Sequence, residues 1–192
     1  MTPDGLTALG VLGAMIVFAG YALSWVSPHF VWLASAGLVI HWLGDSLDGG
    51  LARYRRIEEP TYGFFLDQCV DVLGNLLICT GLGLSPFTHL GTALLALAGY
   101  HMLTIYTLVR ACLDGVFHVT LLNSGPTELR LALILMNALI AMFGAPQFVI
   151  LGLALTWCDV TVSLFAFGFA TTFLYLVTNH ARRLRAKDSA GS

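Results

Sequence analysis

Long apolar segments separated by short polar ones dominate this chain. They predict helices over about residues 6–26, 30–53, 62–84, 90–113 and 126–143, each close to the ~20 residues that cross a bilayer. The apolar stretch from residue 146 to 178 is too long for one simple span. Either the sixth helix is long and tilted, or residues 146–160 form a short outer segment before it. The pattern therefore predicts an all-α integral membrane protein with six transmembrane helices.

The composition supports a membrane protein. Of the 192 residues, 57% are hydrophobic and only 10% are charged, which is too little polar surface to cover a soluble domain. The net charge of −2 gives no reason to expect a nucleic-acid partner. No repeat or linker divides the chain, so residues 1–192 are expected to form a single domain. The four cysteines have no paired metal-ligand spacing and are interpreted as small apolar residues.

The basic residues indicate an orientation in the membrane. In a six-helix arrangement all of them fall on one side, and the turns near residues 27–29, 85–86 and 144–146 contain no Lys or Arg. By the positive-inside rule this side, and with it both termini, is cytoplasmic. The start of the chain lacks the basic residues of a signal peptide, so the first apolar segment is expected to remain as a helix. The nine basic residues are Arg53, Arg55, Arg56, Arg110, Arg130, Arg182, Arg183, Arg185 and Lys187.

Residues 44–75 gather four aspartates into an otherwise apolar sequence. On the second helix, residues three and four apart share one face: Asp45, Asp48, Gly49, Ala52 and Arg53. On the third helix Gly63, Asp67, Asp71 and Asn75 recur one turn apart. A short loop should make the two helices antiparallel neighbours. The two acidic faces are therefore expected to meet near that loop, at the cytoplasmic ends of helices 2 and 3.

Four carboxylates close together need a counter-charge, and Arg53 alone cannot balance them. Divalent ions with oxygen ligands are the natural solution, Mg²⁺ first and Mn²⁺ or Ca²⁺ next. His41 lies one turn before Asp45, where a hydrogen-bonded neighbour is expected rather than a ligand. The alternative is that the acids are solvated surface charges paired with Arg53, Arg55 and Arg56.

The motif Asp-x-x-Asp-Gly-x-x-Ala-Arg, followed by Gly-x-x-x-Asp-x-x-x-Asp, resembles the signature of the CDP-alcohol phosphotransferases. Its defined positions are Asp45, Asp48, Gly49, Ala52, Arg53, Gly63, Asp67 and Asp71. The nine residues from Tyr54 to Tyr62 are a longer connection than the family usually has. The resemblance implies a membrane enzyme of phospholipid synthesis, acting as a homodimer on membrane lipids.

The resemblance also implies roles for individual residues. Asp45, Asp48, Asp67 and Asp71 would hold Mg²⁺ or Mn²⁺, in a pair of ions, and Asp71 would act as the general base. Gly49, Ala52, Arg53 and Gly63 would accommodate the CDP moiety. Residues 2–4 would lie near the nucleotide, although an ordinary helix start with Pro3 in the first turn explains them as well.

The expected reaction moves a substituted phosphate group from a CDP-alcohol to an acceptor hydroxyl and releases CMP. The donor is either CDP-diacylglycerol with a polar acceptor, or a small CDP-alcohol with a lipid acceptor. Only Arg110 and Arg130 offer basic groups beyond the motif and its flanking arginines, which favours an uncharged or zwitterionic acceptor alcohol. The alternatives are a divalent-cation transporter and a catalytically inactive membrane scaffold.

Several polar residues have no assigned role. Arg110 either binds a phosphate or extends to the membrane interface. Glu128 and Arg130 either face the substrate cavity or have no role there. In the second case, Glu128 stabilises the start of its helix and Arg130 belongs to the cytoplasmic excess of basic residues. His101 is expected to be a hydrogen-bonded core residue. The sequence pattern gives no reason for an acid at Asp159. Residues 114–124 are predicted to form a cytoplasmic loop.

Overall fold

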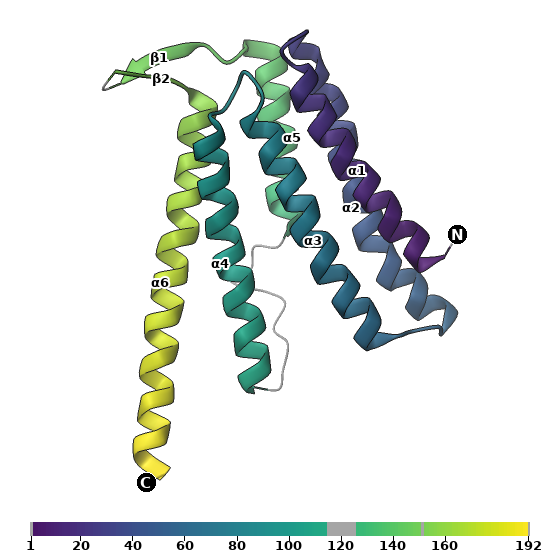
Figure 1. Ribbon diagram of the computed structural model, residues 1–192, viewed down its shortest axis with the longest axis vertical. Coiled ribbons are helices and arrows are strands. Elements are labelled where there is room, and N and C mark those ends of the chain that lie inside the picture. Colours follow the sequence, from purple (N-terminus) through teal and green to yellow (C-terminus); the bar gives the residue numbers. More distant parts are fainter. Residues whose placement is uncertain (1, 115–125, 151, 192) are drawn as a thin grey trace.

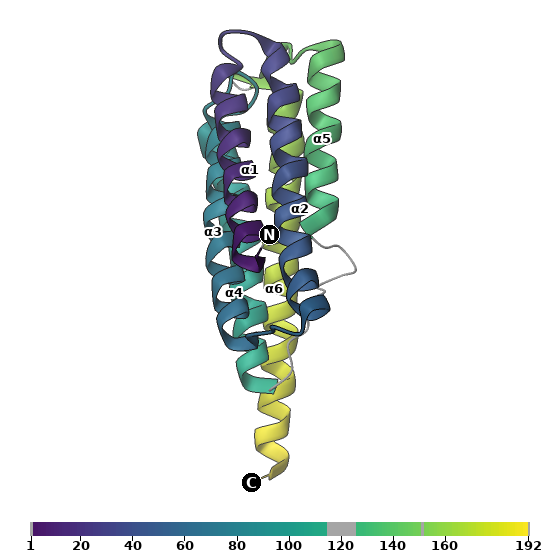
Figure 2. The same ribbon diagram turned by 90° about the vertical axis from the view of Figure 1, so that its right-hand side faces the viewer.

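The computed structural model describes residues 2–114, 126–150 and 152–191. Within these ranges the chain forms an elongated helical bundle with a small antiparallel hairpin at one end (Figures 1 and 2). The predicted loop at residues 114–124 lies almost entirely outside the described residues. The elements are α1 (Pro3–Leu23), the 3₁₀ turn η1 (Pro28–Phe30), α2 (Val31–Arg55), α3 (Pro60–Gly83), α4 (Leu90–Asp114), α5 (Pro126–Phe143), β1 (Gln147–Ile150), β2 (Leu153–Thr156) and α6 (Trp157–Gly191).

The predicted helices agree with the observed ones to within a few residues, and the differences lie at their ends. α1 begins at Pro3 because Thr2 caps it, with the Thr2 hydroxyl accepting a hydrogen bond from the Gly5 backbone N–H at 3.2 Å. α2 ends where Arg56 adopts a left-handed backbone conformation with φ 56°. α3 then begins at Pro60, whose missing N–H costs nothing at a first helical position.

Five helical segments are long and apolar enough to cross a membrane, judged by length and composition over the described residues. They are Pro3–Leu23, Pro28–Arg55, Pro60–Gly83, Leu90–Leu113 and Trp157–Lys187. α5 has 18 residues and packs beside α2. The all-α, multi-span architecture therefore agrees with the prediction, and the count of six spans stays a prediction.

α1 and α2 lie in closest contact, because glycines remove side chains where the two backbones meet. A Cβ atom added to Gly13 would overlap the backbone of His41, and one added to Gly44 would overlap the backbone of Gly10. Small residues at such crossings let helices approach closely in lipid. The close approach aligns the start of α1 with the acidic end of α2.

A buried polar network holds α5 against this pair. The Tyr21 hydroxyl donates to Asn137 Oδ1 at 3.0 Å, and the Asn137 amide donates to Ser35 Oγ at 3.1 Å. All three side chains are buried. Because an unpaired polar group is costly in an apolar interior, the network favours one rotational setting of α5 on α1 and α2.

β1 and β2 pair antiparallel, with Gln147 facing Thr156 and Ile150 facing Leu153. A short segment thus precedes α6, and α6 is itself long, so each of the two alternatives is correct in part. The segment ends at Thr156 rather than at residue 160, because the helix begins at Trp157, and its place on the outer side stays a prediction. Asp159 now has an explanation. It forms a capping box with Thr156, in which each side chain accepts from the other residue's backbone N–H, at 3.0 and 3.2 Å. Asp159 also accepts from the backbone N–H and ring of His89, which joins α6 to the segment before α4.

Candidate active site

Three of the four predicted aspartates converge. Asp45 of α2 and Asp67 and Asp71 of α3 each place a carboxylate oxygen within 4.8 Å of the others, and all three side chains are half-buried. The acidic faces of α2 and α3, which are joined by residues 56–59, come together as the spacing predicts. The expected direct packing of the two helices along their length is wrong, because both pack mainly against α1. Cys69 is exposed and lies outside this group, as its position in the helical turn predicts.

Asp48 lies beside the three-carboxylate cluster rather than within it. The Thr7 hydroxyl donates to Asp48 Oδ2 at 2.7 Å, and the Gly49 backbone N–H donates to Asp48 Oδ1 at 2.6 Å. One carboxylate oxygen is therefore bound by α1 and the other by the backbone of α2 itself. The expectation that four acids meet at one point needs this correction, because the Thr7 bond draws Asp48 toward α1.

Arg130 of α5 provides a cation that the motif does not contain. Its Nη2 atom lies 2.8 Å from Asp45 Oδ2, and the Arg130 side chain is only 10% exposed. The same nitrogen lies 3.4 Å from His41 Nε2. Arg130 therefore contacts the acidic cluster, although it is not among the residues that line the neighbouring cavity. The motif spacing carries no signal for this contact, since it depends on how α5 packs against α2.

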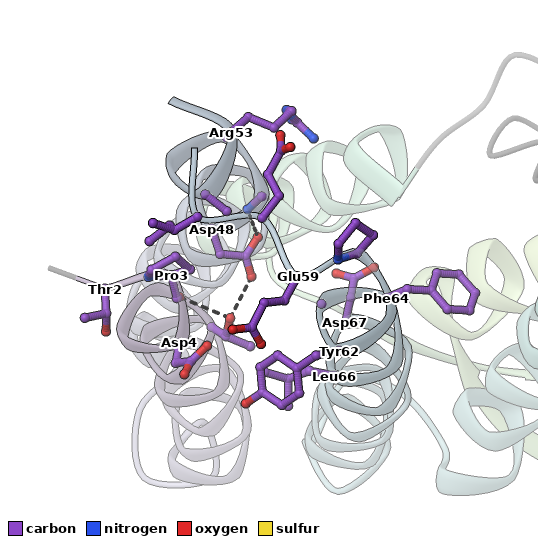
Figure 3. Close-up of a pocket in the computed structure, with 18 of the residues that line it drawn as sticks. Thr2, Pro3, Asp4, Asp48, Arg53, Glu59, Tyr62, Phe64, Leu66 and Asp67 are labelled. Atoms are coloured by element: carbon purple, nitrogen blue, oxygen red, sulfur yellow. Dashed lines mark hydrogen bonds between the residues drawn. The ribbon is translucent and has the colours of Figure 1, made fainter. Parts of the chain in front are cut away.

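A cavity of about 790 Å³ opens beside the acidic cluster (Figure 3). Its walls come from the start of α1, the end of α2, the α2–α3 connection and the start of α3. Asp45, Asp48 and Asp67 line it, whereas Asp71 lies one turn further along α3 and is not among the lining residues. Figure 3 shows Asp48 and Glu59 pointing into this space.

The predicted nucleotide-binding positions all line the cavity: Gly49, Ala52, Arg53 and Gly63. A Cβ added to Gly63 would meet no atom within 4 Å. Packing within the described chain therefore does not require glycine at this position, unlike at Gly13 or Gly44. The presence of glycine at position 63 is consistent with a need to leave space for a ligand.

The first residues of the chain also line the cavity. Thr2, Pro3 and Asp4 belong to its wall, although Thr2 caps α1 as well. The ordinary helix start is thus confirmed, while the proximity of these residues to a nucleotide stays a prediction, consistent with their place on the cavity wall. His101 and Arg110 of α4 are not among the lining residues.

The cluster fits a divalent ion by its donor chemistry. Carboxylate oxygens are the ligands that Mg²⁺ and Mn²⁺ prefer, and three of them are already within reach of one ion. His41 is not one of these possible metal ligands. Its Nδ1 lies 2.9 Å from the Gly10 carbonyl oxygen and its Nε2 faces Arg130, so it is a hydrogen-bonded neighbour, as predicted.

Comparison with known proteins agrees with this arrangement. The family profile described as CDP-alcohol phosphatidyltransferase matches residues 1–174, which include the whole acidic motif. The chain belongs to the CDP-alcohol phosphatidyltransferase family. The family assignment predicted from the aspartate motif is therefore confirmed.

Two relatives carry more specific names. The chain is 38% identical over 94 residues to an archaetidylinositol phosphate synthase of Methanothermobacter thermautotrophicus, across 49% of this chain and 45% of that protein. It is 32% identical over 84 residues to a phosphatidylinositol phosphate synthase of Cutibacterium acnes, across 44% of this chain and 38% of that protein. Each match thus spans less than half the length of the relative.

Proposed function

We propose that this membrane protein synthesises phospholipids by moving a substituted phosphate group from a CDP-alcohol to an acceptor hydroxyl, with release of CMP. The observation that carries the proposal is the convergence of Asp45, Asp67 and Asp71 beside a cavity of about 790 Å³. Family membership supports the same class of reaction.

The proposed metal ligands are Asp45, Asp67 and Asp71, with Asp48, one turn along α2 from Asp45, as the fourth. Mg²⁺ or Mn²⁺ is the expected ion, because the donors are all carboxylates. Bound at this position, divalent ions would neutralise the phosphate oxygens and stabilise the charge on the departing CMP phosphate.

The remaining chemistry falls to residues of the chain. The acceptor oxygen forms a bond to the phosphorus atom, the bond from that phosphorus to the CMP oxygen breaks, and the hydroxyl proton passes to a base. Asp71 is the proposed base, because it is the last aspartate of the motif, to which the resemblance assigns this role, and its carboxylate belongs to the cluster beside which the donor phosphate would lie. Arg53 is positioned to bind a donor phosphate, while Gly49, Ala52 and Gly63 leave room for the cytidine.

The names of the two relatives refine the substrates. Both relatives are named for making a lipid that bears inositol phosphate. We therefore take a CDP-activated lipid, such as CDP-diacylglycerol, as the donor and a phosphorylated inositol as the acceptor. This proposal departs from the uncharged acceptor that the small number of basic residues favours.

The site is proposed to face the cytoplasm, as in the inner membrane of a bacterium. The basic residues Arg53 and Arg55 end α2, and Arg182, Arg183, Arg185 and Lys187 lie near the end of α6. Figure 1 shows the end of α2 and the C-terminus away from the hairpin, whereas the N-terminus lies near the middle of the long axis, at the end of α1 that is further from the hairpin. The positive-inside rule makes the end away from the hairpin cytoplasmic, where a soluble nucleotide is available. A homodimer remains part of the proposal.

The test is release of labelled CMP by the purified protein in lipid nanodiscs, with Mg²⁺ or Mn²⁺ present. CDP-diacylglycerol is tested as the donor with inositol phosphate, inositol, glycerol phosphate and serine as acceptors. CDP-choline is tested as the donor with a lipid acceptor. We expect release with CDP-diacylglycerol and inositol phosphate, and its loss with EDTA or in Asp67→Asn. The matched control is Asp188→Asn, which changes an acid near the end of α6, outside the motif. Metal uptake into liposomes without CMP release would instead support a transporter.

A further inference from the structure

Arg130 makes two contacts that fix the position of its guanidinium at the acidic cluster. Nη2 lies 2.8 Å from Asp45 Oδ2 and 3.4 Å from His41 Nε2. The arginine comes from the first turns of α5, whereas both partners belong to α2. Arg130 thus reaches the cluster from outside the two helices that carry the motif.

The protonation state of His41 follows from its neighbours. A guanidinium can only donate hydrogen bonds, so His41 Nε2 must accept from Arg130. Nδ1 then carries the ring proton and donates to the Gly10 carbonyl oxygen at 2.9 Å. His41 is 1% exposed, and its ring fills the space against Gly74, where an added Cβ would lie 2.9 Å from Cε1. A buried, neutral imidazole therefore accepts from the same Arg130 nitrogen that contacts Asp45.

Arg130 and a metal ion would use the same negative charge. Asp45 is the partner of Arg130 and also one of the three acids within 4.8 Å of one another. The Asp45 side chain is 22% exposed, so water screens this charge only in part. Where water is scarce, a fixed positive charge a few ångströms from an ion site weakens cation binding substantially.

We propose that Arg130 is the internal counter-ion of the acidic cluster and makes tight metal binding depend on the arrival of the nucleotide diphosphate. This inference rests on the proposed function. In the absence of nucleotide, Arg130 neutralises part of the cluster and repels a divalent ion. The diphosphate brings negative charge that offsets Arg130, so the nucleotide and the metal strengthen each other's binding. Arg130 is in this sense a positioning residue, since it acts through Asp45.

A purely structural ion pair has a different consequence. If Arg130 only oriented Asp45 as a ligand, its removal would leave Asp45 misplaced and metal binding would weaken. If it is a counter-ion, its removal strengthens metal binding in the absence of nucleotide. The two roles therefore predict opposite signs for one measurable quantity, the dissociation constant of the metal.

The experiment measures Mn²⁺ binding to the purified full chain in detergent by electron paramagnetic resonance, with and without CDP. In Arg130→Gln we expect Mn²⁺ to bind on the order of tenfold more tightly without CDP. We also expect CDP to enhance Mn²⁺ binding less than it does in the wild type. Arg130→Lys keeps the charge and should stay within about threefold of the wild type. The matched control is Arg183→Gln, which removes an exposed cation from α6.

Each outcome decides a separate point. If the wild type binds Mn²⁺ at a site lost in Asp67→Asn, but Arg130→Gln binds it equally or more weakly, the counter-ion inference is wrong and the proposed function stands. If no variant shows Mn²⁺ binding that depends on Asp67, both the inference and the proposed metal site are wrong. Thermal unfolding verifies that Arg130→Gln is folded. If Arg130→Gln is not folded, Arg130→Met is used in its place. This variant too should bind Mn²⁺ more tightly than the wild type in the absence of CDP.

Discussion

Thr7 of α1 donates a hydrogen bond of 2.7 Å to Asp48 of α2, and this bond links the start of the chain to the acidic motif. Thr7 is 9% exposed, so little water is available to replace it. The bond depends on the close crossing of α1 and α2, which the glycines at residues 10, 13 and 44 permit. The start of α1 is thereby part of the site, although it lies outside the motif.

Replacing Thr7 by Val should therefore impair the site without unfolding the protein. A hydrogen bond to a charged group contributes about 1.5–3 kcal/mol, and its loss frees Asp48 to move. We expect KM for the CDP-alcohol to rise about tenfold, with a smaller change in kcat. The control is Thr107→Val in α4, where the lost bond is to the Leu103 carbonyl oxygen at 3.0 Å. Equal effects of the two substitutions on KM would contradict the role of Thr7.

Replacing Asp71 by Asn should abolish turnover and leave nucleotide binding, measured without divalent ions, largely intact. Asp71 belongs to the cluster but not to the cavity wall, so the nucleotide loses no direct contact. Removal of a general base lowers kcat by about 100-fold or more. Steady-state kinetics and binding of labelled CDP measure the two effects separately. Full activity in a purified, folded mutant would refute the assignment of Asp71 as the base.

Gly63 provides a test of the cavity that does not alter a charge. A Cβ atom at this position would meet no atom of the described chain within 4 Å and the position lines the open cavity, so Gly63→Leu should fold normally. In a helix Leu is more favourable than Gly by up to about 1 kcal/mol, so the melting temperature should not fall. We expect a large rise in KM for the CDP-alcohol, because the side chain enters the cavity. Gly91→Leu is the matched control, since Gly91 also has open space around it but does not line the cavity.

The sequence allows prediction of features that depend on local spacing. The spacing of Asp45, Asp67 and Asp71 was sufficient to place them on facing helix surfaces, and the apolar runs were sufficient to locate the helices. It does not allow prediction of contacts made by packing of distant helices. The Arg130–Asp45 ion pair joins residues on α5 and α2, and the displacement of Asp48 depends on Thr7 of α1. Neither contact has a signature in the spacing of residues.

Asp159 illustrates a signal that was present in the sequence and could have been used. The run Thr-Trp-Cys-Asp at residues 156–159 has the spacing of a capping box before an apolar helix, which explains an acid in that position without any catalytic role. The additional bonds from His89 could not be predicted, because they join segments 70 residues apart.

Replacing Asp159 by Ala should therefore destabilise the protein and spare its chemistry. The substitution removes the Asp159 half of the capping box and leaves the backbone N–H groups of His89 and Thr156 without their acceptor. The bond from the residue 159 N–H to the Thr156 hydroxyl oxygen can remain. Each unsatisfied buried donor costs about 1–3 kcal/mol, so a loss of roughly 2–6 kcal/mol is expected. Thermal unfolding in detergent measures this loss, and KM for the CDP-alcohol at a permissive temperature should stay unchanged. A lowered kcat at full stability would mean instead that the hairpin end of the molecule influences the reaction directly.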